Sequence, residues 1–283
     1  MKRLSFILTS IAFTLLFSCN KENRYECIEG SCVEKQNGKY NSIEDCATAC
    51  NQTIEPEIFN PSLSYGELQD VEGNIYKTIT INDQTWMAEN LRTEKFSNGE
   101  LITHVVEDDE WSSLTEAAWC NFRNNDFNEP THGKLYNWFA VNDERNICPN
   151  GWSIPSRDDW EHLILYLDSI EGADKSGGSL KSISTKSNGM DFWEMRYWKE
   201  PNKYGTNSTG FSALPNGVRS NNGNFVVIGV PDPGGYGTWW SSSDFYSFGD
   251  HSAWLFLLKY DSGDIIFQNR KVTSGRCVRC LKD

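Results

Sequence analysis

The sequence predicts an α+β fold for most of the chain. Helical periodicity is confined to one or two short stretches, while several short strand-like segments are separated by long loops rich in glycine and asparagine. Nine cysteines are available to tie such loops together. Helices and strands that do not alternate regularly along a chain are typical of α+β architecture.

The first residues predict export and a lipid anchor. Two basic residues precede a mostly apolar run over residues 4–17, which is too short to span a bilayer as a stop-transfer helix and is typical of a secretory signal. Residues 16–19, Leu-Phe-Ser-Cys, resemble a bacterial lipobox. We expect a signal peptide over residues 1–18 and acylation of Cys19, so that the protein meets the membrane through N-terminal lipid. An ordinary signal peptide that is cut elsewhere is the alternative.

The charge of the chain restricts its partners. The formal net charge is −13 at pH 7, and loss of residues 1–18 makes it more negative because they hold two basic residues and no acidic one. Nucleic acids and anionic lipid surfaces attract clustered lysine and arginine, so we expect no nucleic-acid partner. We expect a lipid-anchored protein of the cell envelope, at the outer membrane and displayed outward.

A small four-cysteine module is expected over residues 19–50. A segment of about 25 residues cannot bury a sufficient hydrophobic core, and exported modules of this size are typically held by disulfides. We favour a nested pairing of Cys27 with Cys50 and of Cys32 with Cys46. A zinc site built from these four thiolates is the alternative.

A linker and a larger domain are expected to follow. Residues 51–67 contain two prolines and show no clear periodicity, which is typical of a linker. The composition then changes, because all eleven tryptophans lie between Trp86 and Trp254. We expect the domain to cover residues 68–283 and either to bury its indole rings in a core or to present some of them to a ligand.

The larger domain begins with a predicted hairpin. Residues 75–81 alternate apolar and polar side chains with the period of a strand, and Asn82–Asp83 can turn the chain back into residues 84–87. This pattern predicts two antiparallel strands joined by a tight turn.

A helix is expected to begin after Ser156. Asp159 follows Ser156 by three residues, as in a capping box, and acidic residues in the first turn favour the helix dipole. Four apolar residues then recur at helical spacing and predict a single buried stripe: Trp160, Leu163, Ile164 and Leu167.

Beyond residue 170 the chain alternates between loops and short strand-like segments. The predicted strands cover residues 225–230, 238–243, 253–260 and 264–268, and residues 261–264 are the best late hairpin turn. The final cysteines most simply tie the last strand back to the middle of the domain. We favour pairing of Cys148 with Cys280 and of Cys120 with Cys277.

Several motifs of the larger domain together resemble a known family, the Fibrobacter succinogenes major paralogous domain, from about residue 68 to the end. This family occurs in surface and secreted bacterial proteins and is similar to the C-type-lectin-like fold of the formylglycine-generating-enzyme class. The resemblance therefore implies such a fold, although Cys277 stands where the family more often has serine. The motifs are DVEGNIYKTITINDQTWMAENL, GKLYNWFAV, ICPNGWSIPSRDDWEHL, GGSLKS, NSTGFSALPNGVRSNNGNF, GTWWSSS and VRCLKD.

The residues favour binding over catalysis. None of the four histidines stands beside a serine or cysteine in a nucleophile-like setting, and we expect no catalytic residues. Asp158 and His162 could share a metal from one helix face, but a solvated face is the simpler interpretation. Cys277 and Cys280 have redox-motif spacing but lie on a terminal strand, where no helix dipole lowers a thiol pKa.

The favoured ligand site lies in the glycine-rich segment before residue 245. Trp239 and Trp240 are adjacent, so in a strand one ring can enter the core while the other faces outward. An exposed indole suits the C–H face of a sugar, and we expect Tyr236 and Asp244 to complete the site. Burial of both rings is the alternative.

Two weaker sites would involve calcium. Glu200-Pro201-Asn202 matches the tripeptide with which many calcium-dependent lectins hold a sugar, although the usual downstream partner is absent. Residues 107–110 are acidic, but a solvated loop is the simpler interpretation. We otherwise expect no cofactor.

The sequence therefore predicts a surface-displayed lipoprotein that acts as a binding or adhesion module for cell-envelope or extracellular polysaccharide. A structural or protein-interaction module is the first alternative, and a degenerate formylglycine-type enzyme is the second. Exposed aromatic rings would favour glycan binding, buried tryptophans the structural role, and a thiol pair open to solvent in a cleft the enzyme.

Overall fold

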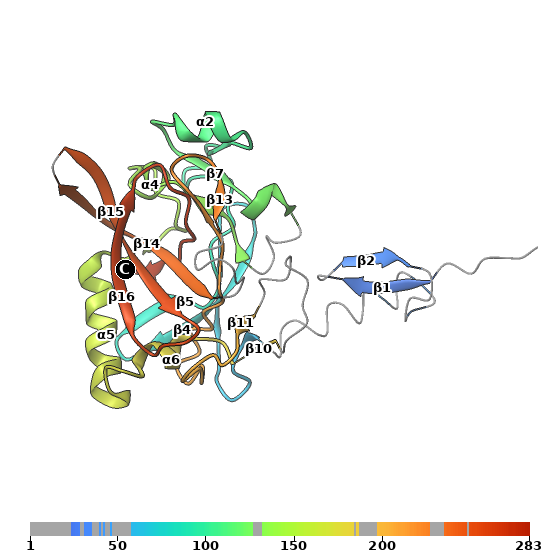
Figure 1. The fold of residues 1–283 in the computed structure, drawn as a ribbon, viewed down its shortest axis with the longest axis vertical. Helices are drawn as coiled ribbons and strands as arrows, with labels where there is room; N and C mark the ends of the chain where they lie inside the picture. Colours follow the sequence, from blue (N-terminus) through green and yellow to red (C-terminus); the bar gives the residue numbers. More distant parts are fainter. Residues whose placement is uncertain are drawn as a thin grey trace, which may run out of the picture. The chain divides into compact units, whose positions relative to one another are not determined.

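The computed structural model describes residues 24–28, 31–35, 40, 42, 46, 58–126, 132–183, 185–186, 197–226, 235–247 and 249–283 (Figure 1). The chain divides into two compact units, Met1–Cys50 and Asn51–Asp283. The predicted signal peptide and Cys19 lie outside the described residues. In the described part of the chain, no helix is long and apolar enough to cross a membrane.

The smaller unit is built on an antiparallel strand pair. Strands β1 (Tyr25–Ile28) and β2 (Ser31–Glu34) place Cys27 opposite Cys32. The predicted Cys32–Cys46 disulfide is confirmed, with a Cα–Cα distance of 5.8 Å. Cys27 is also disulfide-bonded, and its predicted partner Cys50 lies outside the described residues. Since three of the four thiols are oxidised, the alternative of a four-thiolate zinc site is wrong.

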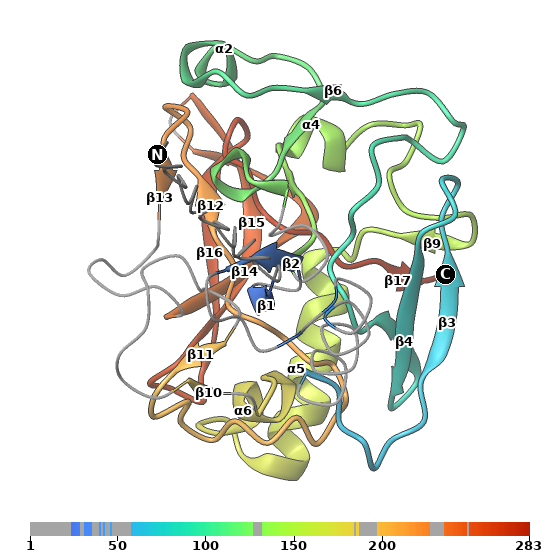
Figure 2. The same ribbon diagram turned by 90° about the vertical axis from the view of Figure 1, so that its right-hand side faces the viewer.

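A five-stranded antiparallel sheet joins the beginning of the larger unit to its last residues (Figure 2). The predicted hairpin is confirmed, with Ile81 opposite Gln84 and Asn82 at a left-handed φ of 55° in the turn. The last strand lies between the hairpin and a segment near the middle of the chain. In spatial order the strands are β3 (Gly66–Gln69), β4 (Ile75–Ile81), β5 (Gln84–Met87), β17 (Leu281–Lys282) and β9 (Trp152–Ser153).

Helix α5 (Arg157–Glu171) starts as the sequence predicts. The Ser156 hydroxyl accepts from the Asp159 backbone N–H, and the Asp159 carboxylate accepts from the Ser156 backbone N–H at 2.8 Å, which completes a capping box. The stripe formed by Trp160, Leu163 and Leu167 is buried, while Ile164 is half-buried.

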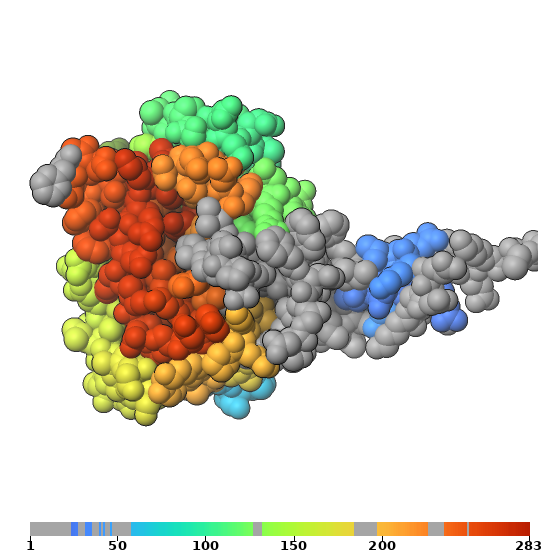
Figure 3. Space-filling view, in the orientation of Figure 1, coloured from blue at the N-terminus to red at the C-terminus, as the bar shows by residue number. Residues whose placement is uncertain are grey.

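Three long strands form the second large sheet. They are β14 (Tyr236–Ser247), β15 (Asp250–Lys259) and β16 (Ile265–Lys271), and they make up a large part of the face seen in Figure 3 (orange to red). Helix α5 contacts β14 and β15 and lies beside this sheet in Figure 1. The predicted strands in this part of the chain are thus confirmed, apart from residues 227–230, which lie outside the described residues.

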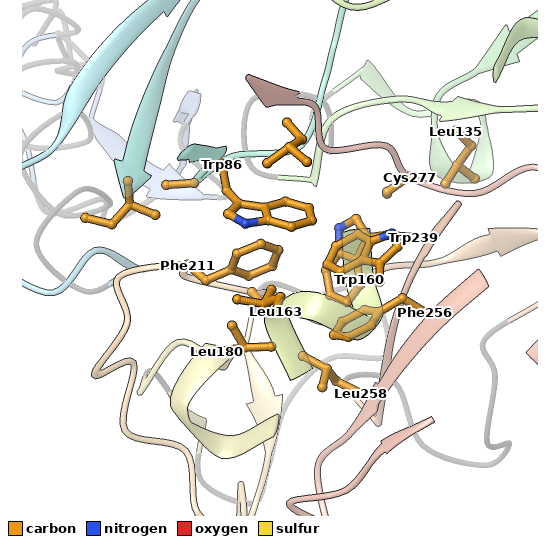
Figure 4. Packing of buried hydrophobic residues seen from close by; sticks show 14 of the residues in the cluster. Trp86, Leu135, Trp160, Leu163, Leu180, Phe211, Trp239, Phe256, Leu258 and Cys277 are labelled. Carbon is orange, nitrogen blue, oxygen red and sulfur yellow. The ribbon is translucent and has the colours of Figure 1, made fainter. Parts of the chain in front are cut away.

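Aromatic rings fill the space between α5 and the two sheets (Figure 4). Trp160 lies between the ring of Trp86, at a centroid distance of 4.5 Å, and the ring of Phe256, at 4.3 Å. The edge of Phe211 meets both indoles and also Trp239. Helix α5 is therefore a central element of the core.

The remaining elements of the larger unit are short. A third sheet combines β6 (Thr103–His104), β7 (Ala118–Cys120) and β8 (Leu135–Tyr136). The others are α2 (Asp108–Ser112), the 3-10 turn η1 (Phe122–Asn124), α4 (Trp138–Val141), α6 (Ser176–Leu180), β10 (Thr185–Lys186), β11 (Trp198–Lys199), β12 (Val218–Arg219) and β13 (Phe225–Val226). Short strands and few helices establish the predicted α+β class.

The predicted linker over residues 51–67 is wrong in its second half. Phe59, Leu63 and Tyr65 pack against the core of the larger unit. The Asn60 side chain donates to the Asn207 carbonyl at 3.0 Å. These residues lack strand or helix periodicity because they form an irregular segment, but their apolar side chains are half-buried against the core. Residues 51–57 lie outside the described residues.

One of the two disulfides predicted for the larger unit is confirmed and the other is wrong. Cys148 and Cys280 are bonded, while Cys120 and Cys277 are buried free thiols. Cys120 is opposite Leu135 in the β7–β8 pair, and the bridge between Tyr136 and Arg276 puts Cys277 on the other side of Leu135. Adjacent strands are separated by about 4.8 Å, so the two cysteines are roughly 10 Å apart, beyond the reach of a disulfide.

Both free thiols are expected to be unreactive in the folded protein. Burial raises the pKa of Cys120 to about 12 and that of Cys277 to about 12, so that at pH 8 only about one thiol in ten thousand is ionised. Iodoacetamide at pH 8 should therefore leave both peptides unmodified before unfolding and alkylate both in guanidinium without reductant. Alkylation of neither peptide after unfolding would show that the two cysteines are oxidised.

Candidate functional site

The predicted aromatic ligand site is wrong, because neither indole reaches solvent. The rings of Trp239 and Trp240 are both fully buried. The Trp239 indole N–H donates to Asn90 Oδ1 at 2.7 Å, and that of Trp240 donates to the Tyr136 carbonyl at 2.9 Å. Sheet β14–β16 has a hydrophobic cluster on each face, so a strand with alternating orientation buries both residues.

The other two residues of that predicted site lie apart. Tyr236 is half-buried at the start of β14, while Asp244 is exposed near its far end. Eight residues of extended strand separate them by roughly 25 Å. The four candidates are therefore not brought together around one ligand.

The residues of the two candidate calcium sites are not arranged around a common ion. Asn202 is buried and donates through Nδ2 to the Ser182 carbonyl at 2.9 Å, whereas Glu200 is exposed. Asp108, in the acidic stretch 107–110, accepts from the Arg219 guanidinium at 3.0 Å as part of helix α2. Among the described residues, no group of three or more histidine, cysteine or acidic side chains is arranged to hold a metal.

His162 contacts Asp83 and not Asp158, with which the sequence could have paired it. Its Nε2 lies 2.9 Å from Asp83 Oδ1 in the β4–β5 turn, and this contact lowers the pKa of the Asp83 carboxyl. The pair links the exposed side of α5 to the hairpin, and Asp158 takes no part in it. We therefore assign His162 a structural contact.

Two open concavities of the described surface lie around β6. We call them the Trp138 lobe and the His104 lobe, and together the β6 groove; both are lined by Leu101, Ile102 and Thr103. Their volumes are about 650 Å³ and about 750 Å³. Cavities of this size are typical of small-ligand sites. Leu101 is 71% exposed, which is unusual for a large apolar side chain, and it stands between the two lobes.

The Trp138 lobe combines aromatic rings with charged groups. Its apolar lining includes the half-buried Phe139 and the almost fully buried Phe96 and Trp138. The ring of His251 meets the edge of Trp138 at 5.3 Å, and its Nε2 is buried with no hydrogen-bond partner among the described residues. Arg145 donates to the Asp143 carboxylate at 2.7 Å and holds the pKa of that carboxyl below its usual range.

The His104 lobe has a stacked pair of rings at its wall. The exposed imidazole of His104 lies parallel to the indole of Trp119, with centroids 4.0 Å apart. The ammonium of Lys134 lies 3.9 Å from the Trp119 ring and 3.2 Å from the Glu94 carboxylate. Asn121 and Asp126 complete the lining, and the Asn121 Nδ2 donates to Asp126 Oδ1 at 2.8 Å.

The groove as a whole is acidic. Five carboxylates and one guanidinium line it, and that guanidinium is already paired with Asp143 and Glu100. An anionic ligand would therefore be repelled, while hydroxyl or ammonium donors would meet suitable acceptors. The charged lining residues are Glu94, Glu116, Asp126, Asp143, Glu144 and Arg145.

No sequence motif pointed to the β6 groove. Its residues come from four separate segments, and the polar lobes carry no motif with regular spacing. One local signal was available, because Leu101 is an apolar residue that follows the turn-forming Asn98-Gly99 in a polar stretch. Its exposure depends on the packing of β6, which spacing alone does not specify.

The sequence of the larger unit matches a family model described as the Fibrobacter succinogenes major domain, over residues 79–282. The chain belongs to this family. The matched region begins within β4 and ends with β17, so it includes the three-stranded sheet, the five-stranded sheet apart from β3 and the start of β4, helix α5 and the β6 groove. No curated protein and no solved structure matches the chain.

Proposed function

We propose that this protein is a lipid-anchored module of the cell envelope that binds polysaccharide in the β6 groove. The observation that carries the proposal is the composition of the groove, where the exposed ring of His104 and the half-buried rings of Phe139 and His251 stand beside carboxylate and amide acceptors in two open lobes. Aromatic faces suit the C–H surfaces of sugar rings, and acceptors suit their hydroxyls. Two lobes that share one wall fit consecutive units of a chain-like ligand. The proposed role is binding rather than catalysis.

A C-type-lectin-like fold is part of this proposal. Two features support it. The capped start of α5 lies in the motif ICPNGWSIPSRDDWEHL, which is part of the resemblance to that fold, and Arg279, just before the last strand, is buried. The pairing of β17 with β5 also brings the end of the domain beside its beginning. Such closure leaves the loops between these strands to form a binding surface.

A structural or protein-interaction role is the second candidate, because tryptophan burial favours it. Nine of the ten described tryptophans are buried, and Trp254 is half-buried. Trp193 lies outside the described residues. The formylglycine-type alternative lacks comparable support, since the free thiols of Cys120 and Cys277 are buried rather than open to a cleft.

The anchor can be tested by metabolic labelling. If Cys19 is acylated, labelled palmitate should enter the wild-type protein, and Cys19→Ala should abolish incorporation and release the protein from membranes. We place the protein at the outer membrane, facing outward, so protease added to intact cells should degrade it. Equal labelling of the variant would contradict the lipid anchor.

The groove can be tested with two matched leucines. Leu101 and Leu165 are 71% and 69% exposed, but Leu165 lies on α5 outside the groove. Leu101→Arg should weaken polysaccharide binding by about tenfold or more, since it fills the shared wall with a long charged side chain, while Leu165→Arg should leave it unchanged. Isothermal titration calorimetry of the full chain with plant and bacterial polysaccharides measures the affinity of each variant.

The same titration distinguishes the alternatives. Failure of the wild-type protein to bind any polysaccharide would contradict the proposal and favour the protein-interaction role. Loss of binding in EDTA would point instead to calcium, with Glu200 and Asn202 as the residues to replace first.

A further inference from the structure

A buried acceptor in the His104 lobe lacks a donor. Asn121 is only 2% exposed and follows strand β7. Its Nδ2 is engaged by Asp126, but its Oδ1 is buried with no hydrogen-bond partner among the described residues. Native proteins rarely leave a buried oxygen without a donor, so a group that supplies one should bind here favourably.

The neighbours of Asn121 in this lobe are acceptors as well. Asp126 is exposed and accepts from the Asn121 amide, which leaves lone pairs on its carboxylate. The Glu94 carboxylate is 47% exposed and faces the ammonium of Lys134. A ligand must therefore bring donors and must not bring negative charge.

The stacked rings supply the apolar part of the lobe. Trp119 is buried beneath His104 and Lys134, so its indole is not itself the contact surface. The imidazole of His104 is exposed and covers one face of the indole. A flat ring held parallel to a second ring is a rigid platform for the C–H face of a sugar.

We propose that the His104 lobe selects an uncharged sugar unit and excludes acidic ones, an inference that rests on the proposed polysaccharide function. Hydroxyls of the sugar donate to Asn121 Oδ1 and to the Asp126 carboxylate, and one face of the sugar ring packs on His104. Uronate and sulfated sugars are repelled by Asp126 and Glu94. The ligand class is thus a neutral polysaccharide.

The test compares neutral polysaccharides with their carboxymethylated derivatives on the full chain by isothermal titration. The wild-type protein should bind the neutral form about tenfold more tightly, because like charges in contact are unfavourable. Asp126→Asn keeps the shape of the side chain and its contact with Asn121. It should reduce the ratio between the affinities for the neutral and the carboxymethylated forms. Asp109→Asn removes an exposed charge outside the groove and should leave the ratio unchanged.

A second pair of variants tests the platform. His104→Ala should weaken binding of the neutral form by about fivefold, whereas His162→Ala, which removes an exposed histidine from α5, should have no effect. Circular dichroism verifies that each variant is folded.

The outcomes separate this inference from the function on which it rests. Three results would overturn the neutral-sugar lobe: equal binding of the neutral and carboxymethylated forms by the wild-type protein, an unchanged ratio in Asp126→Asn, or unchanged binding of the neutral form in His104→Ala. If Leu101→Arg still weakens binding, polysaccharide binding in the groove remains in place. Absence of binding to every polysaccharide would overturn both.

Discussion

Replacing Cys148 and Cys280 by serine is expected to lower the free energy of unfolding of the larger unit by about 5 kcal/mol. The disulfide joins residues separated by 132 positions, and cross-linking so long a loop removes much of the entropy of the unfolded chain. The bond is buried and adjoins β17. Because domains are commonly stable by only about 5–15 kcal/mol, the variant should be close to unfolding at 37 °C.

Urea unfolding followed by tryptophan fluorescence measures this effect, since every tryptophan lies in the larger unit. The matched control replaces Cys32 and Cys46 by serine, which removes a disulfide of the smaller unit and should leave the fluorescence transition in place. A shift of less than about 1 kcal/mol in the Cys148 and Cys280 variant would show that the loop is constrained by other contacts.

Arg279→Met is expected to destabilise the larger unit by about 3–5 kcal/mol. The Arg279 guanidinium is buried, and burial lowers its pKa to about 9, so that it remains charged at neutral pH. It donates to Asn90 Oδ1 at 2.8 Å and to the carbonyls of Phe211 and Ser212. Asn90 Oδ1 keeps the Trp239 indole as a donor, but methionine leaves the carbonyls of Phe211 and Ser212 without the guanidinium, each at a cost of about 1–3 kcal/mol.

The matched control is Arg270→Met on β16. Arg270 is exposed, and its removal should change stability by no more than about 0.5 kcal/mol. Arg279→Lys retains the charge but not the planar set of donors, so its loss of stability should lie between those of Arg279→Met and Arg270→Met. Wild-type stability in Arg279→Met would mean that the surrounding carbonyls find water when the guanidinium is removed.

Elements specified by neighbouring residues could be predicted from the sequence. The hairpin around Asn82 and the capped start of α5 at Ser156 depend on side chains within a few positions, and both have the predicted form. The apolar spacing of α5 likewise identified its buried face. Local hydrogen bonding and periodicity are sufficient for such elements.

Features that depend on distant segments could not be predicted in this way. Whether Trp239 and Trp240 face solvent depends on what covers each side of β14, and clusters from α4 and α5 cover both. Cys120 and Cys277 lack a bond because β8 lies between their strands. The irregular segment at residues 58–65 has no periodic pattern, since it is shaped by contacts with residues such as Asn207.

The candidate site also depends on contacts between distant segments. Asn121 and Asp126 are near each other in sequence, but Glu94 and His104 reach the same lobe only through the arrangement of β6 and β7. None of these residues was a candidate for ligand binding, because no spacing rule connects them. Trp239 and Trp240, whose adjacency in a strand predicted one outward-facing ring, both belong to the core.

The position of β17 has a consequence for biosynthesis. Leu281 pairs with both Trp86 and Ser153, and the residues just before it supply Arg279 to the core and Cys280 to the disulfide. A ribosome makes these residues after every other element of the larger unit, so a nascent chain lacks the strand that joins β5 to β9. We therefore expect this unit to stay loosely organised until β17 has emerged from the ribosome, and to close only then.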